Sequence, residues 1–243
     1  MNGFYGECLR LEMFGQSHAE SVGMTLEGVP AGARVDFDAL LRFMQRRAPG
    51  RSEYATARRE ADVPEFTSGL RDGVTDGMPI TAVIRNTDVR PQDYDALRTV
   101  PRPGHADYSA WLRYGSIPTG GGEFSGRMTA PLCIAGGICL QLLENEGVSI
   151  RARVNEIGGA HDEKAMHDKI MQAKAEGDSV GGVIECTAEG VPAGLGGALF
   201  GGMESRISAV VFGIPAVKGI EFGAGFASVS YTHLRAHETV LDL

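Results

Sequence analysis

The sequence predicts one domain of mixed α and β structure, an α+β fold. Three segments carry apolar residues at helical spacing, and between them lie short alternating or β-branched runs typical of strands. Glycine makes up 34 of the 243 residues without a three-residue period, and 43% of the residues are hydrophobic, which excludes collagen-like and disordered chains. The chain is long enough to bury a sizeable core.

The first predicted helix covers residues 35–47. Apolar residues recur there at helical spacing: Phe37, Leu40, Leu41 and Met44. Asp36 or Asp38 is placed to cap the N-terminus of this helix, and the Pro49-Gly50 pair ends it. We therefore expect an amphipathic helix that carries arginines to its C-terminal end.

Arginines cluster at this helix end and beyond it. Between residues 42 and 59 there is one acid, Glu53, against six arginines: Arg42, Arg46, Arg47, Arg51, Arg58 and Arg59. Planar guanidinium groups suit phosphate and carboxylate ligands, so a site for an anion is one interpretation. A solvated helix end, whose cations favour the negative end of the helix dipole, is the other.

Two more helices and several strands follow. Residues 129–145 are apolar on most faces and contain Gly136-Gly137, which predicts a helix buried deeply and packed closely against other backbone. Residues 161–176 place a single apolar stripe among charged residues, as in a surface helix. Strands are predicted at Met24–Glu27, Pro79–Asn86 and Val183–Ala188.

The hexamer EGVPAG occurs twice, at residues 27–32 and 189–194. A Ser-Val-Gly sequence precedes each copy, and each copy follows a predicted strand. Two strands that end in the same Pro-Gly turn indicate a duplicated βα half. A shared turn without duplication is the alternative.

Charge and cysteine usage narrow the class of protein. The net charge of -8 argues against a general nucleic-acid binder, because the phosphate backbone would be repelled. The longest apolar run, residues 130–140, is shorter than the roughly 18 residues of a membrane span, so we expect a cytoplasmic protein that does not enter membranes.

The cysteines are scattered among apolar neighbours and are expected to be reduced core thiols: Cys8, Cys133, Cys139 and Cys186.

Four segments combine glycine with polar or ionisable residues: 14–19, 101–108, 120–127 and 214–219. Glycine lets backbone amides approach a ligand, as in anion-binding loops. His18 and His105 lie in two of these segments, and a histidine can hold or release a proton near neutral pH. Both are therefore candidates for general acid or base, although each also fits a hydrogen-bonded loop histidine.

Two other kinds of site are not favoured. Gly177–Gly182 mimics the nucleophile loop of trypsin-like proteases, with Ser179 as the nucleophile, but Val180 stands where that motif needs glycine. No His, Cys or carboxylate pair has a recognised metal-ligand spacing in a matching context, so no metal site is expected.

The four loops together resemble chorismate synthase, a flavin-dependent lyase. The resemblance extends from about Gly6 to Phe226 and is most specific at residues 101–108, 68–80 and 86–94. It also covers the segment that mimics a protease loop. Two motifs depart from the family: GESHG stands here as GQSHA at residues 15–19, and Glu123 replaces the usual arginine after the three glycines.

The resemblance implies a specific reaction. 5-Enolpyruvylshikimate 3-phosphate loses phosphate and a ring proton by 1,4-elimination and becomes chorismate, a step of the shikimate pathway towards aromatic amino acids. Reduced FMN is required although nothing is oxidised overall, and NADPH is the implied reductant. The alternative is that this chain is an inactive fragment that binds flavin or an anion.

The resemblance also implies roles for single residues. His105 would protonate the departing phosphate, and His18 would manage a proton on the flavin. The implied contacts to the substrate, which bears one phosphate and two carboxylates, are Ser17, Arg47, Arg102, Ser125 and Arg127. The implied FMN contacts are Glu123, Phe124, Ser125, Pro215 and Ala216.

The implied fold is a helical layer between antiparallel sheets, internally duplicated and assembled as a homotetramer. We expect residues 1–229 to form one partial domain that is incomplete at its C-terminus. Residues 230–243 match nothing in the family motifs and are expected to be a non-native or disordered tail.

Overall fold

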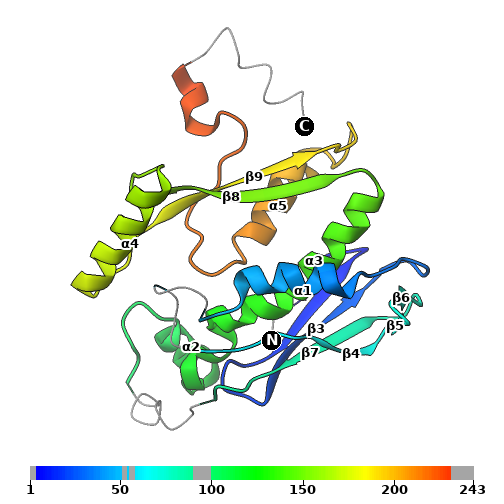
Figure 1. Cartoon of the computed structure of the whole chain (residues 1–243), viewed down its shortest axis with the longest axis horizontal. Coiled ribbons are helices and arrows are strands. Elements are labelled where there is room, and N and C mark those ends of the chain that lie inside the picture. Colours follow the sequence, from blue (N-terminus) through cyan, green and yellow to red (C-terminus); the bar gives the residue numbers. More distant parts are fainter. Residues whose placement is uncertain (1–3, 51–53, 55–57, 90–99, 231–243) are drawn as a thin grey trace.

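The computed structural model describes residues 4–50, 54, 58–89 and 100–230 (Figure 1). Several sequence predictions lie outside this part: those for Arg51, Glu53, Asp93, Tyr94 and the tail after Ser230. The described residues confirm the predicted class, because they form both helices and antiparallel sheets.

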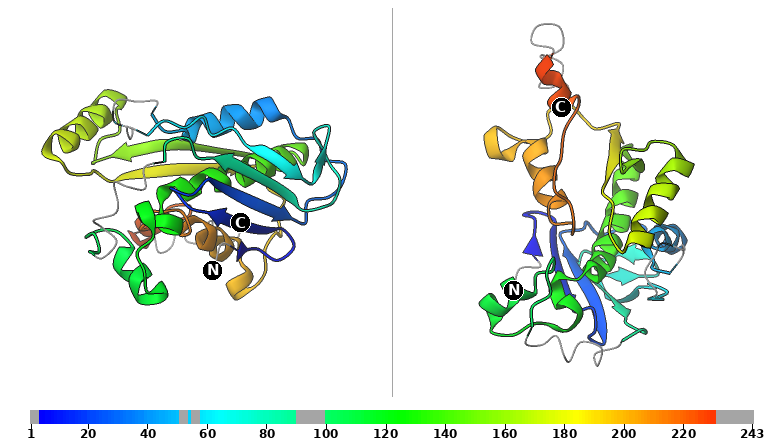
Figure 2. Two further views of the ribbon diagram at one scale, coloured as in Figure 1. Left: turned by 90° about the horizontal axis from the view of Figure 1, so that it is seen from below. Right: turned by 90° about the vertical axis from the view of Figure 1, so that its left-hand side faces the viewer.

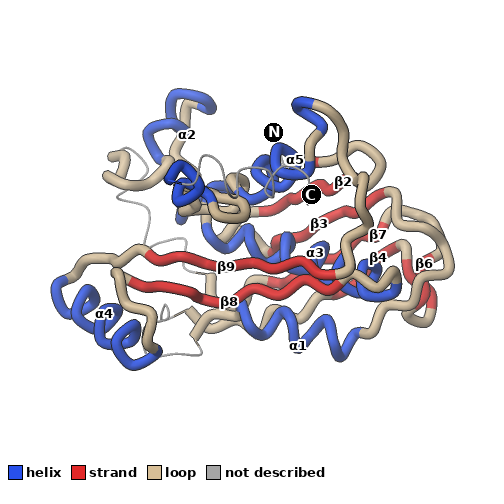
Figure 3. The backbone as a smooth tube through the Cα atoms, turned by 90° about the horizontal axis from the view of Figure 1, so that it is seen from above, coloured by secondary structure: helices blue, strands red, loops and turns tan. Residues whose placement is uncertain are grey.

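A layer of helices lies between two antiparallel sheets (Figure 1, Figure 3). The larger sheet has the order β1-β2-β3-β7-β4, and β8 pairs with β9 on the other side of the layer. The strands are β1 (Phe4–Tyr5), β2 (Arg10–Gly15), β3 (Ser21–Glu27), β4 (Glu65–Ser68), β5 (Leu70–Arg71), β6 (Val74–Thr75), β7 (Ile80–Arg85), β8 (Ser149–Ile157) and β9 (Gly182–Glu189).

The α-helices are α1 (Phe37–Arg47), α2 (Asp107–Tyr114), α3 (Thr129–Asn145), α4 (Glu163–Glu176) and α5 (Met203–Val211). The described residues also form short 3-10 helices, which are η2 (Thr119–Phe124), η3 (Gly126–Met128), η4 (Leu199–Gly201) and η5 (Gly225–Ser230). Helices α1 and α3 form the central layer, and Figure 2 shows α4 and α5 on opposite sides of the β8–β9 pair.

The sheet contributes one apolar face to the core. Its central strands pair so that buried residues lie opposite one another: Val22 opposite Ile84, Met24 opposite Ala82, and Leu26 opposite Ile80. Alternation along each strand places these side chains on the same face. That face packs on the buried residues of α1 and α3, so most of the core lies between the larger sheet and the helical layer.

The predicted helices are confirmed, with small shifts at their ends. Asp36 caps α1 by accepting a hydrogen bond from Ala39 N at 2.9 Å, and α3 spans residues 129–145 as predicted. Helix α4 starts at Glu163, two residues later than expected, because Asp162 is its N-cap. Helix α2 occupies the end of a segment predicted as a loop.

Both copies of the repeated hexamer lie in the same setting, as the predicted duplication requires. Each begins at the last residue of a strand, β3 or β9, that pairs antiparallel with the preceding strand of its sheet. The glycine after each strand has a positive φ, 87° at Gly28 and 77° at Gly190. A β-carbon at either position would collide with a carbonyl oxygen of the partner strand's end, which explains the glycine in both copies.

Two sequence predictions are wrong in part. Cys133 and Cys139 pack against the core as predicted, but Cys8 and Cys186 are exposed, because Cys8 lies in a bend before β2 and every residue of β9 is exposed. Gly137 does pack closely, yet its neighbours are side chains of α1, and Gly136 faces open space.

The central helix is also the most apolar segment of the described chain. Residues 126–145 are long and apolar enough to cross a membrane by length and composition. Their buried positions, among them Ala130, Ile134 and Ile138, contact the core instead. This stretch therefore has the properties of the central helix of a globular domain.

Candidate active site

The loop after β2 carries Ser17 and His18 against a turn of three glycines. Ser17 is buried, and its hydroxyl donates a hydrogen bond to the carbonyl of Gly120 at 3.1 Å. Gly120, Gly121 and Gly122 have φ of 62°, 86° and 53°, and a β-carbon at Gly120 would lie 2.5 Å from His18 Nε2. Glycine permits both the backbone conformation and this close approach, so the turn fixes where the His18 ring lies.

Asn86, directly after β7, connects this loop to two arginines. Its side-chain nitrogen donates to the carbonyls of Gln16 and Ala19 at 3.1 and 2.8 Å. Its Oδ1 accepts from Arg127 Nε at 3.0 Å and from Arg58 Nη2 at 3.4 Å. One side chain therefore positions the loop after β2 relative to two guanidinium groups.

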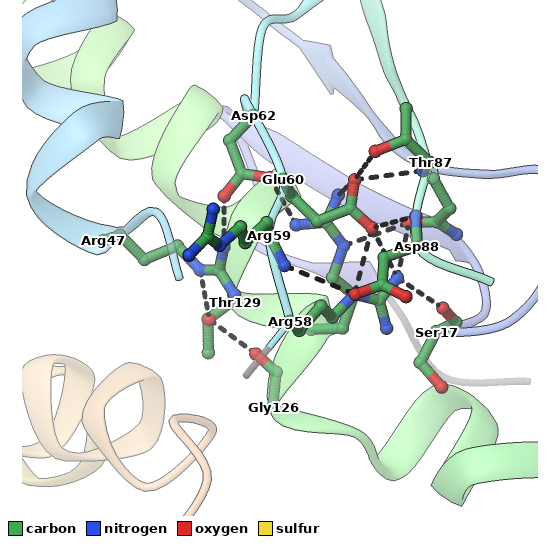
Figure 4. A network of polar contacts seen from close by, with 12 residues as sticks. Ser17, Arg47, Arg58, Arg59, Glu60, Asp62, Thr87, Asp88, Gly126 and Thr129 are labelled. Carbon is green, nitrogen blue, oxygen red and sulfur yellow. Dashed lines mark hydrogen bonds and ion pairs between the residues drawn. The ribbon is translucent and has the colours of Figure 1, made fainter. Parts of the chain in front are cut away.

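Arg47 at the end of α1 and Arg127 in η3 meet at Asp62. Figure 4 shows Arg47 and Asp62 side by side in this network. One carboxylate oxygen of Asp62 accepts from Arg47 Nη1 and the other from Arg127 Nη1. The Arg127 side chain is 3% exposed, and its Nη2 is buried with no hydrogen-bond partner among the described residues. That Nη2 also lies 4.0 Å from Glu60 Oε2, as an ion pair. A buried guanidinium with a donor outside any hydrogen bond is suited to an anionic ligand.

Glu60 holds the neighbouring arginine, Arg58. Its carboxylate accepts from Arg58 Nη2 at 2.8 Å, from the Thr87 hydroxyl at 2.7 Å and from the Thr87 and Asp88 amides at 3.0 and 3.2 Å. Burial raises the pKa of Glu60, but these hydrogen bonds outweigh burial and lower the pKa to about 2. Glu60 is therefore charged at neutral pH.

The arginine cluster divides into two groups. Arg42, in the middle of α1, and Arg46, in its last turn, are both exposed, and Arg46 fits a solvated helix end. Arg47 and Arg58 turn inward, where their side chains are 21% and 19% exposed and pair with buried acids. The solvated helix end thus describes Arg46, whereas Arg47 and Arg58 pair with acids of the chain itself, and a site for an anion at these two stays a prediction.

Arg102 lies before α2 and pairs with Asp107 in the first turn of that helix. Its Nε and Nη2 donate to the two carboxylate oxygens at 2.7 and 3.0 Å, and its backbone amide donates at 3.1 Å. The hydrogen bond from Arg102 lowers the pKa of the buried Asp107, although burial opposes it. His105 is exposed between them, with Nδ1 3.4 Å from the carbonyl oxygen of Pro103.

The residues expected to touch FMN lie on two separate segments. Glu123 and Phe124 are exposed at the end of η2, and the Phe124 ring lies 6.5 Å from that of Tyr114. Ser125 follows, and its hydroxyl accepts from Arg127 N at 3.3 Å. This first segment is therefore continuous with the buried arginine network.

Pro215 and Ala216 form the second segment, in an exposed loop after α5. Ala216 has a φ of 71°, a conformation that residues other than glycine rarely adopt. Among the described residues, no hydrogen bond joins this loop to residues 123–125. The structure therefore does not link the two segments directly.

Comparison with known protein families identifies the chain. The family model described as chorismate synthase matches residues 9–242. The chain belongs to the chorismate synthase family. It is therefore a lyase of the shikimate pathway, which converts 5-enolpyruvylshikimate 3-phosphate to chorismate, and its family requires a reduced flavin.

Individual relatives agree with this assignment. A chorismate synthase of Lancefieldella parvula is 43% identical, with the alignment covering 93% of this chain and 70% of the relative. A chorismate synthase of Chitinophaga pinensis is 42% identical, with the alignment covering 100% of this chain and 72% of the relative. A crystal structure of chorismate synthase superposes with a TM-score of 0.73 at 25% identity, over 92% of this chain and 70% of that one. None of these matches favours an inactive fragment or a serine hydrolase.

The structure brings together several of the residues that resemblance to chorismate synthase selected. Ser17 and His18 lie against the glycine turn, and Arg47 and Arg127 meet at Asp62. Ser125 lies between these groups. Arg102 and His105 share the segment before α2, and Pro215 and Ala216 lie apart.

The acids and the amide that hold this site together were not among the predicted site residues. They are Glu60, Asp62, Asn86 and Asp107. A sequence signal exists for the first two, because they follow directly after an arginine-rich stretch in alternate positions. Their partners lie up to 65 residues away, so the pairing itself appears only in the folded chain.

Proposed function

We propose that Arg47, Arg102 and Arg127 bind the phosphate and carboxylates of the substrate, with Ser17 and Ser125 as neutral donors. The meeting of Arg47 and Arg127 at Asp62, with an unused buried donor on Arg127, is the observation that carries this proposal. Arginine forks recognise both kinds of anionic group. The substrate carries three anionic groups, one phosphate and two carboxylates, and each is a suitable partner for a guanidinium group.

The two histidines have separate proton tasks in this proposal. His105 is exposed in a loop beside Arg102, where it protonates the departing phosphate. His18, fixed against Gly120, would hold or release the proton that the reduced flavin exchanges. This assignment is supported by the position of the two rings on different loops. His105 can therefore act on the phosphate while His18 acts on the flavin.

The cofactor of this proposal is reduced FMN, held by Glu123, Phe124, Ser125, Pro215 and Ala216. Phe124 fits this role, because its ring is 38% exposed beside Ser125 and the buried network. When bound, FMN supplies electron density that helps to expel phosphate. NADPH is the proposed source of reducing equivalents, and NADPH oxidation measured with and without FMN tests it.

We also propose a cytoplasmic homotetramer. The β8–β9 pair supports assembly, because three of its apolar residues, Val154, Val183 and Ile184, are 48%, 47% and 64% exposed. Apolar surface of this kind is typical of subunit interfaces. Light scattering after size exclusion measures the assembly directly, and a monomer at micromolar concentration would contradict it.

The substrate contacts are tested by Arg127→Ala and Arg102→Ala. Removing one partner of a buried charge pair costs about 2–5 kcal/mol, so each change should weaken substrate affinity by roughly 30-fold or more. The measurements are anaerobic chorismate formation with reduced FMN, followed by absorbance, and equilibrium binding of 5-enolpyruvylshikimate 3-phosphate. Arg10→Ala, which removes an exposed ion pair with Glu27, is the control. Affinity within about twofold of the unchanged chain would reject the contact.

A further inference from the structure

Asp62 is the most enclosed acid of the arginine network. Its side chain is fully buried, and its two oxygens bind guanidinium groups from two distant elements, the end of α1 and η3. The pairs with Arg47 and Arg127 use both oxygens, so neither arginine competes with the other. One carboxylate thus sets the separation of two cations that would otherwise repel each other.

Each of the two arginines is held by part of its guanidinium group only. Arg47 donates through Nη1 to Asp62 and through Nε to the Thr129 hydroxyl at 3.0 Å. Arg127 donates through Nη1 to Asp62 and through Nε to Asn86 at 3.0 Å. The Nη2 of Arg127 is buried without a hydrogen bond among the described residues. That nitrogen lies 4.0 Å from Glu60 Oε2, an ion pair without a hydrogen bond. The network therefore orients a donor that it does not use in a hydrogen bond.

The backbone at Asp62 adopts an unusual conformation. Its φ is 51°, in the left-handed region that non-glycine residues rarely adopt. Aspartate and asparagine tolerate this region better than other side chains. The conformation persists because the surrounding ion pairs hold the residue in place.

We propose that Asp62 is a positioning residue, which sets the spacing and direction of Arg47 and Arg127 for the anionic groups of the substrate. This inference rests on the proposed function, in which both arginines bind substrate. Asp62 acts through the arginines and touches no reacting atom. Its loss should therefore weaken substrate binding more than it slows the chemical step.

The decisive variant is Asp62→Asn. Asparagine keeps the shape of the side chain and tolerates the positive φ, but it removes the charge between the two cations. We expect KM for 5-enolpyruvylshikimate 3-phosphate to rise by about tenfold or more, with kcat within about threefold and FMN affinity within about twofold. A purely structural role would lower the thermal midpoint without changing KM of the folded enzyme. Glu65→Gln, which breaks the exposed pair with Arg85, is the control and should change neither constant.

A double-variant cycle distinguishes the substrate contacts of the two arginines from the positioning role of Asp62. In an Arg127→Ala background, Asp62→Asn should raise KM by less than about threefold further, because both changes remove the same interaction. Arg47→Ala and Arg127→Ala with unchanged KM would reject the proposed substrate contacts. A raised KM in those variants with an unchanged KM in Asp62→Asn would reject the positioning role alone.

A second variant applies if Asp62→Asn does not fold. Asp62→Glu keeps the charge and moves the carboxylate by one methylene group. The positive φ costs glutamate about 1–2 kcal/mol, which is small beside the roughly 5–15 kcal/mol stability of a typical domain. The variant should therefore fold, with KM raised at least about threefold. Folded Asp62→Glu with the KM of the unchanged chain would overturn the inference.

Discussion

Gly137 of α3 packs against Leu40 of α1 so closely that a β-carbon on the glycine would lie 2.5 Å from Leu40 Cδ1. The next neighbour, Phe43 Cδ1, would lie 3.0 Å away. This contact joins the two helices of the central layer, and both helices contribute to the same core. The α1–α3 spacing therefore depends on the absence of a side chain at one position.

The change Gly137→Ala should consequently destabilise the fold. Overpacking of a well-packed core typically costs about 1–3 kcal/mol, more than alanine gains as a better helix former. Urea unfolding followed by circular dichroism measures the difference. The control is Gly136→Ala in the same helix, where a β-carbon meets nothing within 4 Å. This control should raise stability by about 0.5–1 kcal/mol, and equal effects of the two changes would refute the packing argument.

Periodicity predicted the helices of this layer because their apolar faces are set by local spacing. The limits of α3 and the cap of α1 at Asp36 agree with the structure for that reason. The two-residue strands β1, β5 and β6 have no such local signal, because pairing with a neighbour defines them. Helix α2 also escaped prediction, since the Pro- and Gly-rich residues 101–104 before it are typical of a loop.

The residues of the candidate site were predicted less completely than the helices. Resemblance to a family selected Arg47 and Arg127, but not the carboxylate between them. Buried acids such as Asp62 are recognised by their partners, and the partners converge only after folding. The same holds for Asn86, whose four hydrogen bonds join a loop, a strand end and two arginines.

Glu60 should make the stability of the protein sensitive to acid. Its pKa in the folded chain is about 2, below the ordinary value of 4.5. Stability from its charged form is therefore fully present above about pH 4.5 and is lost as the pH falls towards 2. The variant Glu60→Gln should lose about 1–3 kcal/mol at pH 7, typical of hydrogen bonds to a charged group, and should show a flatter decline in acid.

Unfolding at several pH values between 7 and 3 measures this difference. The matched control is Glu65→Gln, because Glu65 pairs with Arg85 on the surface and its side chain is 51% exposed. That change should leave the acid profile within about 0.5 kcal/mol of the original. An equally steep decline in Glu60→Gln would show that other carboxyl groups govern the acid response.

The four thiols should react with iodoacetamide at different rates. Burial raises the pKa of Cys133 and of Cys139, which reduces their thiolate fraction. Burial also restricts the access of iodoacetamide to both sulfur atoms. Cys8 is exposed and should be modified at least about tenfold faster than either. Peptide mass spectrometry over time at pH 8 gives the rates. Cys186 lies on β9, so protection of this thiol in the native protein would indicate that assembly covers the β8–β9 pair.

The contact between His18 and Gly120 gives the most direct test of the proposed proton chemistry. General acid or base groups typically contribute about 10²–10⁴ in rate, so His18→Ala should lower kcat by that range while FMN affinity changes little. A β-carbon at Gly120 would enter the space of the His18 ring, and the φ of 62° disfavours any side chain. Gly120→Ala should therefore displace the imidazole and reproduce most of this loss although it leaves His18 in the sequence.

Anaerobic turnover with reduced FMN and thermal unfolding together separate the displacement from a general loss of fold. Gly181→Ala is the matched control, because its backbone conformation is ordinary and a β-carbon there meets nothing within 4 Å. This control should retain turnover within about twofold. If His18→Ala loses turnover and a folded Gly120→Ala does not, the glycine turn does not position the ring. If His18→Ala itself keeps near-normal turnover, the imidazole packs in the loop without moving a proton, because a group in the reaction path cannot be removed without slowing the step it serves.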